Sequence, residues 1–292
     1  MNKEKILLAG KIAKEVRDWI KPQIKKDMLL LDIAEKIENK IIELGGKPAF
    51  PVGLAINEVA AHYTPSYNDD SKAYGLLKVD FGVHIDGWIS DNAFSVDLEN
   101  SEENKKLIKA SEQALQNAIE KTEFGISVNE IGKIIAEVVE DAGFSSVVNL
   151  GGHGLDEYDA HSEPFIPNFD NNNSETIEEG LIAIEPFVTN GNGKVKDGVF
   201  GGIYQLVDEK NVRSENAREI LNFIIEEYDE LPFCARWIVK EFGVKALFGL
   251  RELENNGNLH SYSQLIESGK GIVAQAEHTI FIKDGEKVVT TE

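Results

Sequence analysis

The sequence predicts an α+β fold: a pseudo-twofold antiparallel sheet covered by helices on one side, with a helical insertion subdomain late in the chain. Three observations lead to this prediction. Segments with helical spacing of apolar residues are followed by extended segments, and this order then starts again. A shift of 98 residues superimposes the glycines that end two amphipathic segments, Gly45 and Gly143. Residues 76–98 alternate like a β-hairpin around Asp86-Gly87.

The two predicted units have matching elements. In order, they are helices 2–20 and 27–44, extended segments 47–57 and 76–98, helices 103–121 and 128–142, and strands around 146–150 and 181–188. Because the second copy repeats the order of the first, we expect both to contribute to one sheet.

The third part of the chain differs in its pattern of predicted elements. Residues 214–254 read as three helices broken at Leu231-Pro232 and Gly243, after which strands return at 271–282 and 287–291. A helical block between strands of one sheet indicates an insertion. We therefore expect a catalytic domain formed by 1–195 and 268–292, and an insertion subdomain over 196–267.

Bulk composition excludes several classes of protein. The net charge is −21, from 51 acidic and 30 basic residues, and no basic tract is present, which argues against a nucleic-acid partner. Charges interrupt the N-terminal apolar pattern, so it resembles neither a signal peptide nor a membrane span. The single cysteine, Cys234, permits no internal disulfide and fits a core position in a reducing compartment. We expect a cytoplasmic protein with no membrane contact.

The hairpin carries two carboxylates whose placement follows from its turn. With a two-residue turn at Asp86-Gly87, the numbers of paired residues sum to 173. Asp80 then lies opposite Ala93 and Asp91 opposite Gly82, so both carboxylates are on the same face. Gly82 and Ala93 are small, and we expect them to leave space above the sheet. Two neighbouring buried carboxylates need either a cation or a shared proton.

Other polar side chains interrupt apolar or glycine-rich segments. GGHGLDEYDAH (151–161) contains His153 and His161, Glu185 ends a strand before Pro186, and Glu277 lies within an apolar strand. Four carboxylates and one imidazole suit two divalent ions that share bridging carboxylates, and hydrolysis is the reaction class that such a centre favours. The predicted ligands are Asp80, Asp91, His153, Glu185 and Glu277. Considered alone, His62 fits either a structural or a site position, and His278 fits either a core or a surface position.

In the order and context of these residues, the sequence resembles the methionine aminopeptidases. The ordered ligands stand in the contexts VDFGVHIDGWISDNA, GGHGLDEYDAH, IEPF and QAEHT, and the insertion with its LPFCARW is similar to the archaeal form of the type II enzymes. The resemblance covers essentially the whole chain. It implies the pita-bread fold, a monomer, and removal of the N-terminal methionine from nascent proteins and peptides near the ribosome.

The resemblance also implies roles. Asp80 and Asp91 would hold one ion, Asp91 and Glu277 would bridge to the second, and His153 and Glu185 would complete the ligands of that second ion. The ions would be cobalt, manganese, iron or zinc, which a carboxylate-rich site does not distinguish. Glu185 would move the proton, His161 and His62 would contact the substrate and stabilise the tetrahedral intermediate, and Phe50 would form a wall of the methionine pocket.

One departure and two alternatives remain open at this stage. The eukaryotic type II enzymes have a pocket histidine after the fourth ligand, whereas GGIYQLVDE offers Tyr204 or Gln205 there. An Xaa-Pro aminopeptidase or prolidase resembles the same ligand set, although residues 1–45 are too short for its extra N-terminal domain. A non-catalytic adaptor of the same fold is the second alternative, but such adaptors lack ligands that this chain retains.

Overall fold

Seven α-helices and sixteen strands make up the protein, and the structure, a computed structural model, describes all 292 residues. The helices are α1 (Lys3–Ile20), α2 (Leu30–Glu43), α3 (Glu102–Lys121), α4 (Val128–Asp141), α5 (Glu215–Tyr228), α6 (Ala235–Phe242) and α7 (Ala246–Asn256), with a short 3-10 helix at Lys21–Gln23. None of the α-helices combines the length and the apolar character that crossing a bilayer would require.

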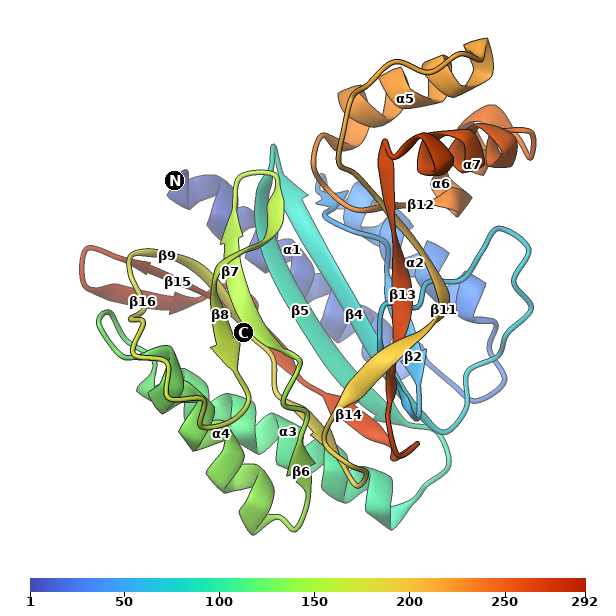
Figure 1. Cartoon of the computed structure of the whole chain (residues 1–292). Helices are drawn as coiled ribbons and strands as arrows, with labels where there is room; N and C mark the ends of the chain where they lie inside the picture. Colours follow the sequence, from blue (N-terminus) through green and yellow to red (C-terminus); the bar gives the residue numbers. More distant parts are fainter.

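The strands form three antiparallel sheets (Figure 1). The largest has the order β1 (Lys47–Pro48), β4 (Leu76–Ile85), β5 (Trp88–Asp97), β15 (Glu277–Lys283), β9 (Gly180–Ile184), β7 (Gly151–Asp156) and β8 (Asp159–Pro167), with β2 (Gly53–Ile56) paired to β4 and β16 (Glu286–Val289) paired to β15. A second sheet has the order β14 (Val273–Gln275), β10 (Phe187–Thr189) and β6 (Ser145–Ser146). The third has the order β12 (Phe233–Cys234), β11 (Val195–Leu206), β13 (Leu259–Glu267) and β3 (Val59–Ala61).

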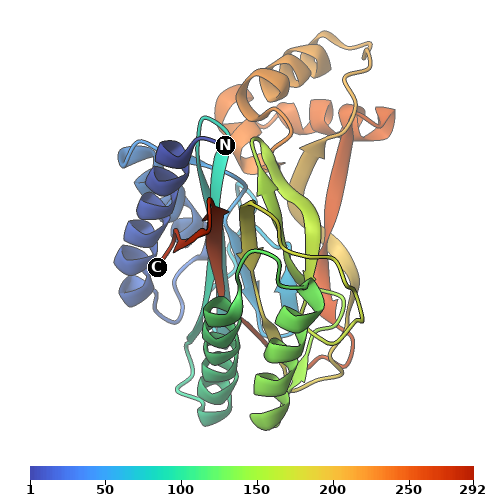
Figure 2. The same ribbon diagram turned by 90° about the vertical axis from the view of Figure 1, so that its left-hand side faces the viewer.

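Helices α1 to α4 cover one face of the large sheet. Val79 and Phe81 of β4 belong to the core shared with α1 and α2, and Ile280 and Ile282 of β15 belong to the core shared with α3 and α4. Figure 2 shows α1 and α2 on one side of the sheet, with β11, β13 and the last three helices on the other. Because side chains alternate along a strand, the residues between these apolar ones point away from the helices.

The repeat predicted from the sequence is present in the helices. Helix α4 begins and ends 98 residues after α2. Both helices end in the same way: Gly45 and Gly143 follow them with φ of +89° and +81°. In each case the glycine N–H and the next N–H donate to carbonyls of the last turn, which is a Schellman cap.

The hairpin register is also confirmed. Ile85 pairs with Trp88, Asp80 with Ala93, and Gly82 with Asp91. Asp86 and Gly87 both have positive φ, +46° and +85°, as a type I′ turn requires. Asp80 and Asp91 therefore lie on the face of the sheet that the helices leave free.

The segment 196–267 holds the three helices predicted within 214–254, together with β11 to β13. It has a core of its own, whose buried members all fall between Tyr204 and Leu259. Sequence patterns missed β11 and β13, the long strands at its two ends. Two register shifts interrupt their pairing between Asp197 and Tyr204, where glycines are frequent, so the alternation expected of a strand is lost. The division into 1–195 plus 268–292 and 196–267 stays a prediction.

Candidate active site

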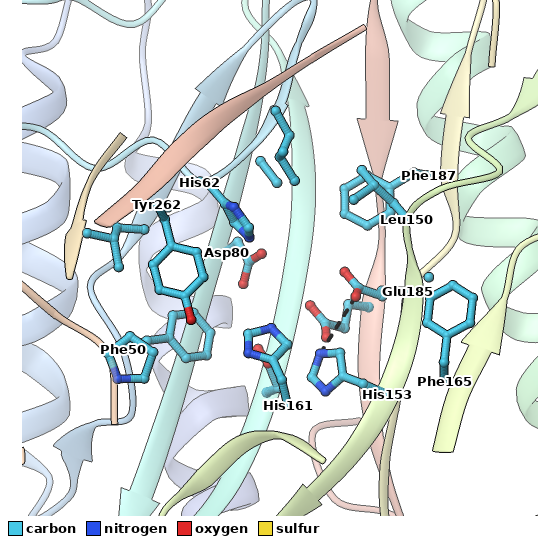
Figure 3. A pocket seen from close by; sticks show the side chains of 18 of the residues that line it. Phe50, His62, Asp80, Leu150, His153, His161, Phe165, Glu185, Phe187 and Tyr262 are labelled. Atoms are coloured by element: carbon cyan, nitrogen blue, oxygen red, sulfur yellow. Dashed lines mark ion pairs between the residues drawn. The ribbon is translucent and has the colours of Figure 1, made fainter. Parts of the chain in front are cut away.

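A cavity of about 450 Å³ lies between the free face of the large sheet and the strands β11 and β13. Figure 3 shows side chains from both sheets pointing into it. Its wall includes the five predicted ligands and the three residues assigned to the substrate by resemblance: Asp80, Asp91, His153, Glu185, Glu277, Phe50, His62 and His161. The pairing of strands distant in the sequence brings these residues together.

Three neighbouring strands supply three of the carboxylates. Asp80 is on β4 and Asp91 on β5, while Glu277 begins β15, where it pairs with Ala93. These side chains share the free face because the alternating residues of each strand pack on the helices. Glu185 stands between β9 and β10, at the break that Pro186 imposes.

His153 joins the carboxylates from β7, where it pairs with Ala183 of β9. Ligand atoms of Asp91, His153 and Glu277 all lie within 4.8 Å of one another. His153 Nε2 is 3.6 Å from Glu185 Oε1, the contact dashed in Figure 3. His153 Nδ1 lies 3.0 Å from the Gly154 carbonyl. A donated Nδ1–H leaves Nε2 unprotonated and facing the carboxylates, as metal-ligating histidines are oriented.

A neutral amide holds the remaining two carboxylates. Gln275 Nε2 donates to Asp80 Oδ2 and to Glu185 Oε2, both at 3.1 Å. Sequence reasoning missed Gln275 because an uncharged amide in a buried strand carries no pattern of its own. The only available signal is its position two residues before Glu277, which places both on one side of the extended segment.

The carboxylates lack the partners that buried oxygens normally have. One oxygen of Asp80, one of Asp91 and both of Glu277 are buried without a hydrogen bond. Burial raises the pKa of Asp80 to about 6, and burial followed by carboxylate repulsion raises the pKa of Asp91, Glu185 and Glu277 well above the ordinary range. Orphaned acceptors from three carboxylates, next to the Glu185 carboxylate and an imidazole nitrogen, fit a divalent cation. This chain can therefore hold the metal that such a donor set implies.

Two further histidines face the same cavity. Burial, followed by the neighbouring His161, lowers the pKa of His62 to about 4 and that of His153 to about 3. Burial also lowers the pKa of His161, whose ring lies 4.4 Å from the ring of His153. These imidazoles are therefore neutral near pH 7, and each can donate or accept a hydrogen bond without bringing a charge.

The apolar wall corrects one expectation from the sequence. A Cβ at Gly82 would lie 2.5 Å from Phe50 Cε1 and 2.9 Å from Ala49 Cβ. Gly82 is therefore small because the Phe50 ring packs over it, and the expectation that it leaves space for ions is wrong. The glycine instead lets the Phe50 ring pack against the sheet and line the cavity.

Neither residue proposed at the missing histidine position lines the cavity. Tyr204 belongs to the core of 196–267, and Gln205 accepts a hydrogen bond from the Tyr262 hydroxyl. Their neighbour Ile203 does line the cavity, as do Tyr262 and Leu265 of β13. Sequence reasoning missed these three because they belong to the two strands that it did not predict.

Two other residues prove structural. His278 is on the helix-covered face, where Nδ1 lies 2.7 Å from Thr291 Oγ1 and 3.3 Å from Arg17 Nη1. Cys234 is buried, as predicted, and burial raises its thiol pKa to about 12, which leaves it unreactive.

Comparison with known sequences identifies the family that the motifs resembled. The family model described as Metallopeptidase family M24 matches residues 4–223. The methionine aminopeptidase of Methanocaldococcus jannaschii is 43% identical over 99% of this chain and 98% of its own length. That of Pyrococcus abyssi is 42% identical over the full length of both.

Solved structures agree on the fold. The methionine aminopeptidase of Rickettsia prowazekii superposes with a TM-score of 0.70 and 22% identity, covering 99% of this chain and 96% of that one. A thermophilic Arx1 gives 0.82 at 15% identity over 99% and 91%. The Pyrococcus furiosus prolidase gives 0.62 at 16% identity, covering all of this chain but 64% of that one. The pita-bread fold is therefore confirmed.

Proposed function

This chain belongs to metallopeptidase family M24, and we propose that within this family it is a methionine aminopeptidase, a hydrolase that cleaves the first peptide bond of chains beginning with methionine. The observation that carries the proposal is the cluster of four buried carboxylates and His153, whose orphaned oxygens face a cavity with apolar walls. A methionine side chain is apolar and flexible, and suits a wall made by Phe50, Ile203 and Leu265.

We assign the ligands to two divalent ions. Asp80 and Asp91 would hold one ion, Asp91 and Glu277 would bridge both, and His153 with Glu185 would hold the second. When bound, such ions polarise the scissile carbonyl and lower the pKa of an attacking water.

The protein's own groups would then handle the proton and the developing charge. Glu185 is buried, its pKa is raised by burial, and it can take a proton from water and pass it to the leaving amine. His161 and His62 are neutral near pH 7 and can donate hydrogen bonds to the carbonyl oxygen as it becomes negative. Phe50, His62 and His161 would position the substrate.

The two alternatives make different predictions. Prolidases share the fold, but this chain covers 64% of the Pyrococcus furiosus enzyme, consistent with an additional domain there. A non-catalytic adaptor would need no ligands, whereas here five potential ligands share one cavity. The substrate class separates the three functions.

The experiment is methionine release from Met-Ala-Ser after ion-by-ion reconstitution, compared with Xaa-Pro peptides. Asp91→Asn should abolish release, while Asp86→Asn, on the exposed turn of the same hairpin, should leave it unchanged. Preferred cleavage of Xaa-Pro would favour the prolidase, and a protein that binds no ion and cleaves nothing would favour the adaptor.

The remaining proposals concern the setting of the reaction. We propose that the protein works in the cytoplasm as a monomer on newly made chains close to the ribosome, without contact to nucleic acid or membrane. The excess of acidic over basic residues supports the absence of a nucleic-acid partner. Sedimentation of the purified protein, alone and with ribosomes, tests both the monomer and the proximity.

A further inference from the structure

His62 reaches the cavity from a backbone conformation that residues with a side chain rarely adopt. Its φ is +62°, in the left-handed region. Such a conformation persists only where the surroundings impose it. On one flank the Leu54 N–H donates to the Tyr63 carbonyl at 2.8 Å, and on the other the Thr64 N–H donates to the Gly201 carbonyl at 2.9 Å. The His62 loop, residues 62–65, is therefore fixed between β2 and β11.

The contact with β11 leaves room only for glycine. A Cβ at Gly201 would lie 1.7 Å from the His62 carbonyl oxygen, and one at Gly202 would lie 2.7 Å from the Thr64 carbonyl oxygen. No side chain fits at these distances. Because β11 belongs to the segment 196–267, that segment packs backbone against backbone on the His62 loop.

A second contact from the same segment comes from α6. Arg236 Nη1 donates to the Pro65 carbonyl at 2.6 Å and to Thr64 Oγ1 at 3.3 Å. Its Nη2 donates to Glu38 of α2, whose other oxygen accepts from Trp237 Nε1 at 3.0 Å. One guanidinium thus joins α6, α2 and the His62 loop, three parts of the chain that lie close together (Figure 1).

The ion pair between Arg236 and Glu38 is buried. Arg236 is 4% exposed and Glu38 is 6% exposed, so both charges have lost their water. A buried ion pair contributes little net stability compared with apolar residues of the same shape, because desolvation offsets the attraction. The planar guanidinium does fix the geometry of its acceptors, which lysine cannot do.

We propose that Arg236 is a positioning residue for His62. It couples the helical segment to the His62 loop and so holds His62 in its left-handed conformation. The proposal rests on the proposed function, in which His62 contacts the substrate. The segment 196–267 would then set the position of a substrate-binding histidine, in addition to contributing Ile203, Tyr262 and Leu265 to the cavity wall.

The test compares Arg236→Met with the double variant Glu38→Gln/Arg236→Met. The single variant leaves the buried Glu38 carboxylate without its cationic partner and should lower the melting temperature, whereas the double variant should recover it. The matched control is Lys287→Met, which also removes a cation from backbone carbonyls, those of Ile119 and Glu120, far along the chain from His62.

Two readouts follow the His62 loop in the metal-free protein, independently of catalysis. In the double variant, the His62 ring signal should shift in the proton–carbon NMR spectrum, and the Thr64 amide should exchange at least about tenfold faster, because its hydrogen bond to Gly201 opens more often. With metal restored, kcat/KM on Met-Ala-Ser should fall between about tenfold and a hundredfold, the usual effect of a displaced contact. The Lys287→Met control should change neither readout.

A double variant that keeps the wild-type His62 signal, Thr64 exchange and kcat/KM overturns the proposal, since Arg236 would then only hold the helices in place. If the wild type itself releases no methionine, the proposed function fails. The two metal-free readouts still decide whether Arg236 positions the loop.

Discussion

The cluster of buried carboxylates makes a testable prediction about the metal-free protein: replacing one of them should stabilise it, and more so as the pH rises. Asp80→Asn removes one charge while keeping an acceptor for Gln275. Burial raises the pKa of Asp80 from 3.8 to about 6, so the native state holds this proton when the unfolded state has released it. Between those values the wild type loses stability as the pH rises.

The magnitude follows from the shift. A raised folded-state pKa contributes stability that is complete below the unfolded pKa and lost by the time the pH passes the folded value. At about 1.36 kcal/mol per unit of pKa, the full loss for Asp80 is about 3 kcal/mol, and about 2.4 kcal/mol of it falls between pH 4 and pH 7. About 1.3 kcal/mol of it falls between pH 5 and pH 7. Removing Asp80 also relieves repulsion on Asp91, Glu185 and Glu277, which acts in the same direction.

Urea unfolding with a chelator present, from pH 5 to pH 8, measures this difference. The free energy of unfolding of Asp80→Asn minus that of the wild type should grow by at least about 1.3 kcal/mol from pH 5 to pH 7. Taking the difference cancels the buried histidines, whose lowered pKa values give the opposite slope in both proteins. With a saturating divalent ion the order should reverse. A difference in unfolding free energy that stays constant or falls as the pH rises contradicts this prediction.

Three more predictions follow from the site. Glu277→Gln should stabilise the metal-free protein at pH 8 by about 1–3 kcal/mol, since it removes a buried charge that Asp91 and Glu185 repel, while calorimetry should find at least about tenfold weaker ion binding; a less stable apoprotein contradicts this. Gly82→Ala should lower stability by about 1–3 kcal/mol and raise KM for methionyl peptides, because the new Cβ meets Phe50; unchanged thermal unfolding and KM would show that the ring can move freely. His62→Ala should lower kcat/KM on Met-Ala-Ser by about 100-fold with unchanged metal content, and an equal loss of bound metal would mean that its role is structural.

How far the sequence predicts this protein depends on whether the controlling interaction is local. The hairpin register could be predicted, because a two-residue turn fixes the parity of every pair beyond it, including that of Asp80 and Asp91. The ends of α2 and α4 could be predicted for the same reason, since a glycine in the left-handed region stops a helix at that residue.

Non-local features were missed or misread. Glycines and register shifts remove the alternation from β11, so Ile203 and the cavity-lining residues of β13 could not be placed. Gln275 is visible only once β14 and β15 bring it between Asp80 and Glu185. The purpose of Gly82 depends on Phe50, which lies in a different part of the chain, so small size alone led to the wrong reason.

In the proposed function, the buried carboxylates hold divalent ions with which the protein removes N-terminal methionine. The most direct measurement is methionine release from Met-Ala-Ser by the metal-free protein, titrated with one divalent ion at a time while bound ion is counted. We expect no release without ion, activity that rises to a plateau as the site fills, and neither binding nor release in Asp91→Asn. Release that is unaffected by chelation, or full activity in Asp91→Asn, would contradict it.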